Sequence, residues 1–197
     1  MGEGLLVYLA GKISKNGWRN KIVLNARDYN PDFKDILLTR VEHVLTTGPF
    51  FISCDHGCYH GEESHGVGAY GQNDEHYPSG CTGERGIPQS AVMKICMEQI
   101  LRSDFVFAYI DSDSCFGTLT EIGIAIGNKI PVAVMFANEE LRAKMWFPME
   151  ASTIVFNKYG AVYTCKTTNL LLIMKASEIA SYLALDPNDE EWCEEHE

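Results

Sequence analysis

One stretch of the chain decides the fold: Ser103-Asp104-Phe105-Val106-Phe107-Ala108-Tyr109-Ile110-Asp111-Ser112-Asp113-Ser114-Cys115-Phe116-Gly117-Thr118-Leu119-Thr120-Glu121-Ile122-Gly123-Ile124-Ala125. Its apolar run at 105–110 is typical of a strand that is buried on both faces of a parallel sheet. A turn of small polar residues follows, and then a helical pattern over 119–127. A strand, a turn and a helix in this order form the repeating unit of α/β proteins.

The same alternation runs along the rest of the chain. Further strands are expected at residues 5–10, 49–53, 131–136, 152–156 and 161–163. Helices are expected at residues 32–45, 89–102, 119–127, 139–145 and 169–185. We therefore predict a three-layer α/β fold of the flavodoxin or Rossmann type, with a parallel sheet of about five strands and helices on both faces. Ligands of such sheets bind at the carboxyl ends of the strands.

Composition predicts one domain with a small ligand. The chain has 197 residues, 46% of them apolar, which suits a single domain over 1–185 followed by an acidic tail over 186–197. The net charge is −11 with only 16 Lys and Arg residues, which argues against a nucleic-acid partner. A small molecule is the better expectation.

Several features predict a cytoplasmic protein without a membrane partner. The seven cysteines are an odd number for a disulfide framework. No apolar run approaches the roughly 20 residues that cross a bilayer. The first residues lack a basic leader, and Leu6 stands where a myristoylation signal has Ser or Thr.

The turn and helix after the central strand predict a binding site for a phosphate or a sugar. Small residues let a ligand approach the backbone, and the first N–H groups of the helix would face it. The candidate ligand contacts here are Ser112, Ser114, Gly117 and Thr118. Glu121 is expected in the first turn, where the helix dipole favours its ionised form at neutral pH. Such a carboxylate can attack an anomeric carbon and form a glycosyl-enzyme ester.

A structural role for Glu121 is the alternative. Thr118-Leu119-Thr120-Glu121 has the pattern of a capping box, in which the glutamate returns a hydrogen bond to the backbone of the cap. The tetrapeptide by itself favours this capping role, and the surrounding sequence favours the functional one.

Four segments of the chain resemble the nucleoside 2-deoxyribosyltransferase-like superfamily. They are Val7-Tyr8-Leu9-Ala10-Gly11, Gly17-Trp18-Arg19, Ser103-Asp104-Phe105-Val106 and Gly117-Thr118-Leu119-Thr120-Glu121-Ile122-Gly123. The resemblance covers residues 5 to about 136. It implies a homodimer or larger assembly, Glu121 as the nucleophile and Tyr8 in the pocket for the sugar or nucleophile. It also implies that Asp111 or Asp113 holds the sugar or the base, and which of them does so is open.

The chain differs from this family at the position of the residue that assists acid–base chemistry beside the glutamate. The family usually has an aspartate eight residues before Asp104, and this chain has Cys96 there. Glu98, Asp113 or a loop histidine could replace that aspartate. The Gly117–Glu121 segment also resembles the Gly-Thr-Leu-x-Glu motif of phosphoribohydrolases related to lysine decarboxylase-like proteins. Because those enzymes also separate a base from a sugar, the reaction class is the same.

Residues 54–88 form a long stretch without a periodic apolar face, which indicates a functional loop. Its possible zinc ligands are Cys54, His56, Cys58, His60, His65 and Cys81. The first four of these stand at every second position, which is unlike the spacing of structural zinc sites, so we expect no metal, and no cofactor is implied. The loop is instead interpreted as a substrate lid in which His56 contacts the base or sugar, the alternative being a solvated polar loop.

Three residues after the first strand complete the expected site. Gly11, Lys12 and Arg19 follow that strand and are expected to contact the substrate. An Arg19–phosphate contact would indicate a nucleoside monophosphate, whereas a structural Arg19 would favour a free nucleoside.

The residues and the resemblance together predict cleavage or transfer of the N-glycosidic bond of a nucleoside or nucleoside 5′-monophosphate. A non-catalytic nucleotide sensor is one alternative, favoured by Cys96. An enzyme that cleaves NAD is another, because NAD also carries a base bonded to ribose.

Overall fold

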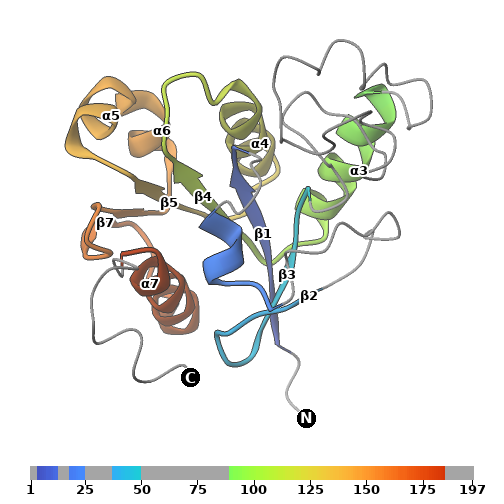
Figure 1. Ribbon diagram of the computed structural model, residues 1–197, viewed down its shortest axis with the longest axis horizontal. Coiled ribbons are helices and arrows are strands. Elements are labelled where there is room, and N and C mark those ends of the chain that lie inside the picture. The colour runs from blue at the N-terminus through green and yellow to red at the C-terminus, as the bar shows by residue number, and fades with distance from the viewer. Residues whose placement is uncertain (1–3, 13–17, 25–36, 50–88, 185–197) are drawn as a thin grey trace, which may run out of the picture.

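A computed structural model of the chain describes residues 4–12, 18–24, 37–49 and 89–184 (Figure 1). The strands are β1 (Leu5–Gly11), β2 (Leu37–Leu38), β3 (Val44–Thr47), β4 (Phe105–Ile110), β5 (Val132–Phe136), β6 (Ile154–Phe156) and β7 (Val162–Cys165). The helices are the 3-10 helix η1 (Trp18–Lys21) and the α-helices α3 (Gln89–Leu101), α4 (Phe116–Gly127), α5 (Glu139–Lys144), α6 (Trp146–Ala151) and α7 (Leu170–Ala184).

The strands form one sheet in the order β2-β3-β1-β4-β5-β6-β7. The five inner strands are parallel, and β2 and β7 pair antiparallel at the two edges. The predicted α/β fold with a mostly parallel sheet is confirmed. The described sheet has seven strands instead of about five. Five are parallel, and each edge carries a short antiparallel strand: β2, which was not expected, and β7, which overlaps the strand expected at 161–163.

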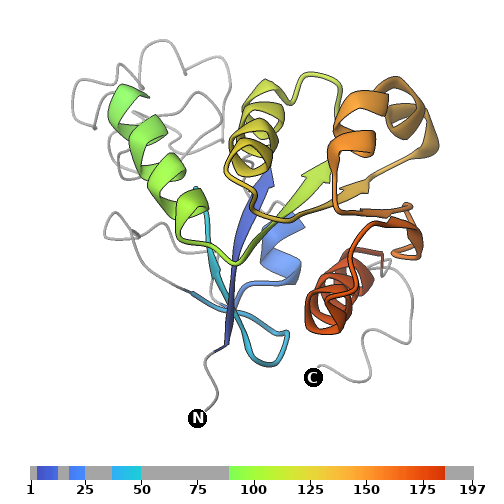
Figure 2. The same cartoon turned by 180° about the vertical axis from the view of Figure 1, so that it is seen from behind.

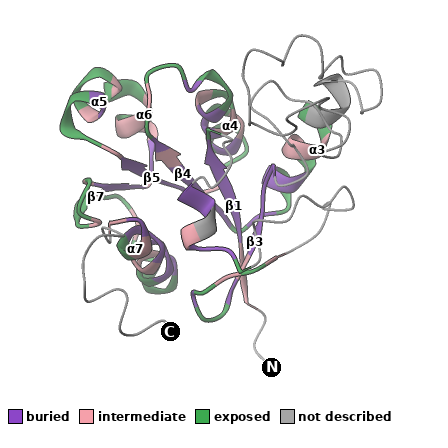
Figure 3. Ribbon diagram, viewed as in Figure 1, coloured by how far each residue is buried: buried purple, intermediate pink, exposed green. Residues whose placement is uncertain are grey.

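Helices cover the sheet on both faces, as the two opposite views show (Figures 1 and 2). Helices α3 and α4 pack on one face, while η1 and α7 lie on the other. Alternate residues of β1 enter the two cores: Val7 and Leu9 face η1 and α7, whereas Tyr8 and Ala10 face α3 and α4. The inner strands are therefore buried on both sides (Figure 3), which explains their continuous apolar sequences.

The helix predicted over 32–45 is wrong in its described part. Residues 37–45 instead form β2, a turn and the start of β3. The hydroxyl of Thr39 donates to the carbonyls of Val41 and Val44 within this turn, and His43 has a φ of 59°, which a helix does not allow. The apolar spacing matched a helix by coincidence, while β-branched Val44 and Thr46 favour a strand. Residues 32–36 lie outside the described residues.

The strand predicted over 49–53 is also wrong at its first residue. The second parallel strand is β3, which ends at Thr47, and Pro49 lies in the bend that follows it. Residues 50–53 lie outside the described residues, as does the expected acidic tail. Proline provides no N–H group for a strand ladder, which fits its place after β3.

The remaining predicted elements differ mainly at their ends. Helix α4 begins three residues before the predicted start, and the pattern over 139–145 belongs to α5, which a further short helix, α6, follows. Pro148 is tolerated in α6 because it lies in the first turn, where no helical hydrogen bond needs its nitrogen. Among the described helices, none combines the length and apolar character that a membrane crossing requires.

Candidate functional site

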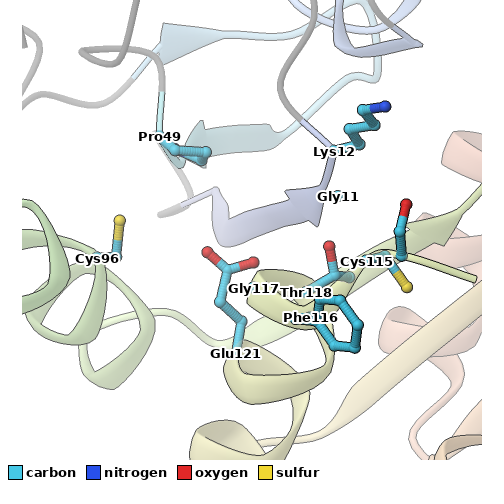
Figure 4. Close-up of a pocket in the computed structure, with 10 residues that line it drawn as sticks. Gly11, Lys12, Pro49, Cys96, Cys115, Phe116, Gly117, Thr118 and Glu121 are labelled. Carbon is cyan, nitrogen blue, oxygen red and sulfur yellow. The ribbon is translucent and has the colours of Figure 1, made fainter. Parts of the chain in front are cut away.

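A pocket of about 360 Å³ opens where β1, β3 and β4 end (Figure 4). Its volume falls within the roughly 300 to 1,000 Å³ typical of small-molecule sites. The described lining residues are Gly11, Lys12, Pro49, Cys96, Ser114, Cys115, Phe116, Gly117, Thr118 and Glu121. Six of the residues predicted from the sequence are therefore brought together here: Gly11, Lys12, Ser114, Gly117, Thr118 and Glu121.

Glu121 lies in the second turn of α4, and its carboxylate points toward β1 (Figure 4). There the hydroxyl of Tyr8 donates a hydrogen bond to Oε1 of Glu121. Tyr8 is completely buried and is not among the described lining residues of the pocket. The pair joins the middle strand of the sheet to the helix that carries the carboxylate.

Burial raises the pKa of Glu121 to about 7, although the Tyr8 hydrogen bond and the positive charge of Arg19 act in the opposite direction. The sequence predicted that the helix dipole keeps Glu121 ionised at neutral pH, and burial opposes that effect here. The helix dipole acts mainly within the first turn, and Glu121 lies one turn further along, in a partly buried position. At pH 7 both forms of the carboxyl group are present.

The capping role of Glu121 is also excluded. Helix α4 begins at Phe116, its N-cap residue is Cys115, and no side chain caps it. Thr118 lies inside the helix and is buried. The Glu121 carboxylate accepts a hydrogen bond from Tyr8, and Glu121 lines the pocket one turn beyond the helix start.

Two neutral acids stand beside this carboxyl group. The pKa of Cys96 is raised to about 12, first by burial and then by the negative charge of Glu121. The pKa of Tyr8 is raised well above its usual value by burial, by Glu121 and by Cys96. Both groups therefore keep their protons at neutral pH. Cys96 projects from α3 into the pocket (Figure 4).

The start of α4 forms the wall of the pocket opposite Cys96 (Figure 4). The N–H groups of its first residues have no acceptor within the helix. The side chain of Thr118 is only 3% exposed, and its hydroxyl points into the pocket (Figure 4). A Cβ atom added at Gly117 would meet no atom within 4 Å, so this wall leaves room for a ligand. Ser112 and Ser114 contact each other through their hydroxyl oxygens at 3.2 Å.

The two predicted loop carboxylates lie outside the pocket lining. Asp111 and Asp113 follow β4 and are exposed, and Ser112 between them is partly buried. His56 and the possible zinc ligands in residues 54–88 lie outside the described residues. Within the parts that are described, no group of three or more His, Cys, Asp or Glu side chains is arranged to hold a metal ion.

Arg19 is buried against the backbone and is absent from the described pocket lining. Its guanidinium donates to the carbonyl oxygens of Leu9, Gly11 and Lys12 at 2.8 to 3.0 Å. It also lies over the ring of Trp18, 4.8 Å from the centroid. Lys12, in contrast, is exposed and lines the pocket.

Sequence reasoning did not select four of the lining residues as ligand contacts: Pro49, Cys96, Cys115 and Phe116. Cys96 had been singled out only as the place of a missing aspartate. Phe116 carries the clearest overlooked signal, because it is a large apolar residue within a run of small polar ones. Its side chain is 74% exposed at the pocket.

The fold and the pocket define an α/β protein with a carboxyl-containing site at the carboxyl edge of its parallel strands. Searches with this chain found no matching family model, curated protein or solved structure.

Proposed function

We propose that the protein cleaves or transfers the N-glycosidic bond of a nucleoside or nucleoside 5′-monophosphate, with Glu121 as the nucleophile. The observation that carries this proposal is a partly buried carboxyl group in a pocket of ligand size, held by the hydroxyl of a completely buried Tyr8. A tyrosine that orients one carboxylate oxygen leaves the other one available to a substrate.

In the proposed reaction, the ionised carboxylate of Glu121 forms a bond to the anomeric carbon while the bond from that carbon to the base nitrogen breaks. The electron pair of the broken bond leaves with the base, which takes up a proton from solvent water. Water then attacks the glycosyl ester, which gives hydrolysis, or a second base attacks it, which gives transfer. Either route returns Glu121 as a carboxylate.

Other lining residues fit the parts of such a substrate. The exposed ammonium of Lys12 and the N–H groups at the start of α4 suit a 5′-phosphate. The exposed ring of Phe116 offers an apolar face to a base. Because the donors of Arg19 are used by backbone carbonyls, Arg19 favours a free nucleoside as the substrate. For a nucleoside 5′-monophosphate, Lys12 is the better candidate for the phosphate contact.

Binding without turnover is the second candidate, and Cys96 favours it. Glu121 is the single carboxyl group among the described lining residues. A thiol whose pKa is about 12 is a poor donor of a proton to a leaving base near pH 7. A nucleotide sensor would need the pocket but no acid.

Product analysis separates these candidates. The protein is incubated with deoxynucleosides, ribonucleosides, their 5′-monophosphates and NAD, with and without an acceptor base, and released base is followed by chromatography. Free base from nucleosides or nucleotides, lost in Glu121→Gln, is the expected result. Release of nicotinamide would indicate an NAD-cleaving enzyme instead. Binding of a nucleotide by calorimetry with no released base would contradict catalysis and indicate a sensor.

A further inference from the structure

Arg19 makes an unusual set of contacts for a residue so close to a candidate active site. Its side chain is 7% exposed. Nε and Nη2 both donate to the carbonyl oxygen of Leu9, at 3.0 and 2.9 Å. Nη2 also donates to Gly11 at 2.8 Å, and Nη1 donates to Lys12 at 3.0 Å. One guanidinium therefore donates hydrogen bonds to three backbone carbonyls at the end of β1.

These contacts hold one wall of the pocket, because Gly11 and Lys12 line it. The planar fork of an arginine fixes several acceptors at once, which an ammonium group does less well. The ring of Trp18 supports the guanidinium from one side and packs against Gly11. A Cβ atom at Gly11 would lie 2.6 Å from Nε1 of Trp18, so the glycine is what lets the ring approach.

Arg19 also brings a positive charge into this core. Its charge lowers the pKa of Glu121 and opposes the effect of burial there. In the described part of the chain, the other titratable groups that act on Glu121 or on Arg19 are Tyr8 on β1, Cys96 on α3 and Asp111 after β4. Tyr8 and Cys96 are neutral at pH 7, so Arg19 is the cation of this group.

We infer that Arg19 is a positioning residue for the proposed reaction and not a phosphate ligand: its guanidinium fixes the Leu9–Lys12 backbone at the pocket wall and brings a buried positive charge into this core. This inference rests on the proposed function for its catalytic meaning. The hydrogen bonds of Arg19 are made within the protein itself, so they do not depend on the proposed function.

Two variants separate the hydrogen bonds from the charge. Arg19→Gln removes both, whereas Arg19→Lys keeps the charge and loses the fork. The ionisation of Glu121 is followed by carbon NMR on the full chain labelled with ¹³C-glutamate, and its signal is assigned by its absence in Glu121→Gln. Arg40→Gln is the matched control, because Arg40 is exposed before β3, at the opposite end of the strand from the pocket.

In Arg19→Gln we expect the midpoint of Glu121 to rise by about one pH unit. In Arg19→Lys it should stay near the wild-type value, while kcat falls about tenfold with little change in KM. A folded Arg19→Gln with an unchanged midpoint would overturn the inference. If Arg19→Gln does not fold, Arg19→Lys is the test. A kcat equal to that of wild type in Arg19→Lys, or unchanged amide shifts of Gly11 and Lys12, would overturn the inference.

Failure of the proposed function gives a different pattern. In that case the wild-type protein releases no base from any substrate, while the NMR midpoints and the amide shifts still report whether Arg19 holds the wall and favours ionised Glu121.

Discussion

The hydroxyl of Tyr8 donates a hydrogen bond to Oε1 of Glu121, which lies 113 positions further along the chain. The bond links β1 to α4, and Glu121 lines the pocket. Because the pKa of Tyr8 is raised well above its usual value, the hydroxyl stays protonated and remains a donor. The hydrogen bond therefore orients the carboxyl group, and it partly offsets the rise that burial causes in the pKa of Glu121.

Replacing Tyr8 with Phe should move the pH dependence of base release. The reaction needs ionised Glu121, so the wild-type rate should rise with pH through about 7. The Tyr8 hydrogen bond favours ionisation, so in Tyr8→Phe the midpoint should lie higher and the rate at pH 7 should be about tenfold lower. The measurement is kcat/KM from pH 5 to 9. Tyr182→Phe on α7 is the control, and an unchanged midpoint in Tyr8→Phe would contradict the role of this bond.

Glu121→Gln should stabilise the protein at high pH. The pKa of Glu121 in the folded state, about 7, exceeds the ordinary value of 4.5. The folded state therefore binds this proton more tightly, and the stability it contributes is present at low pH and is lost as pH rises from 4.5 to 7. Glutamine does not ionise. The free energy of unfolding of the variant minus that of wild type should therefore be about 1 to 3 kcal/mol larger at pH 8 than at pH 4.5.

Urea unfolding of both proteins at the two pH values gives this difference. A gain that is the same at pH 4.5 and pH 8 would show that the carboxyl group is not the cause.

Two glycine substitutions should have opposite effects. In Gly11→Ala the new methyl group would meet the buried ring of Trp18 at 2.6 Å, so we expect a loss of about 1 to 3 kcal/mol in stability. In Gly123→Ala, within α4, the methyl group meets no atom within 4 Å, and higher helix propensity should give a gain of up to about 1 kcal/mol. Thermal unfolding compares the two, and equal changes would refute the steric argument at Gly11.

Lys12→Gln should distinguish a phosphorylated from an unphosphorylated substrate. Lys12 is exposed at the pocket, and its charge would attract a 5′-phosphate. We expect KM for a nucleoside 5′-monophosphate to rise about tenfold and KM for the matching nucleoside to stay the same. Lys158→Gln, in an exposed turn outside the pocket lining, is the control. Equal changes for both substrates would rule out a phosphate contact by Lys12.

The fold followed from the sequence where strands are buried on both faces. The apolar runs of β1, β4 and β5 have no competing interpretation, and their order predicted both the sheet and the pocket edge. Between residues 37 and 47 the prediction failed. There the apolar spacing suited a helix. The chain forms strands instead because Thr39 stabilises a turn and β3 pairs with β1.

The site was predictable where residues follow a strand directly. Gly11, Lys12, Ser114, Gly117 and Thr118 line one pocket because parallel strands end at one edge, and their contact with a substrate stays a prediction. Cys96 and Pro49 come from elements whose orientation depends on packing, which local patterns do not report. The pKa of Glu121 likewise depends on burial by distant segments, and Arg19 differs from its expected place because its contacts are with the backbone.

Glu121 as nucleophile is tested most directly by mass spectrometry of the protein after a brief incubation with a substrate from the panel and acid quenching. We predict a mass increase equal to the sugar or sugar phosphate, located by peptide mapping on the peptide that contains Glu121 and absent in Glu121→Gln. Base release by wild type without any such adduct, together with full activity of Glu121→Gln, would contradict the assignment of Glu121 as nucleophile.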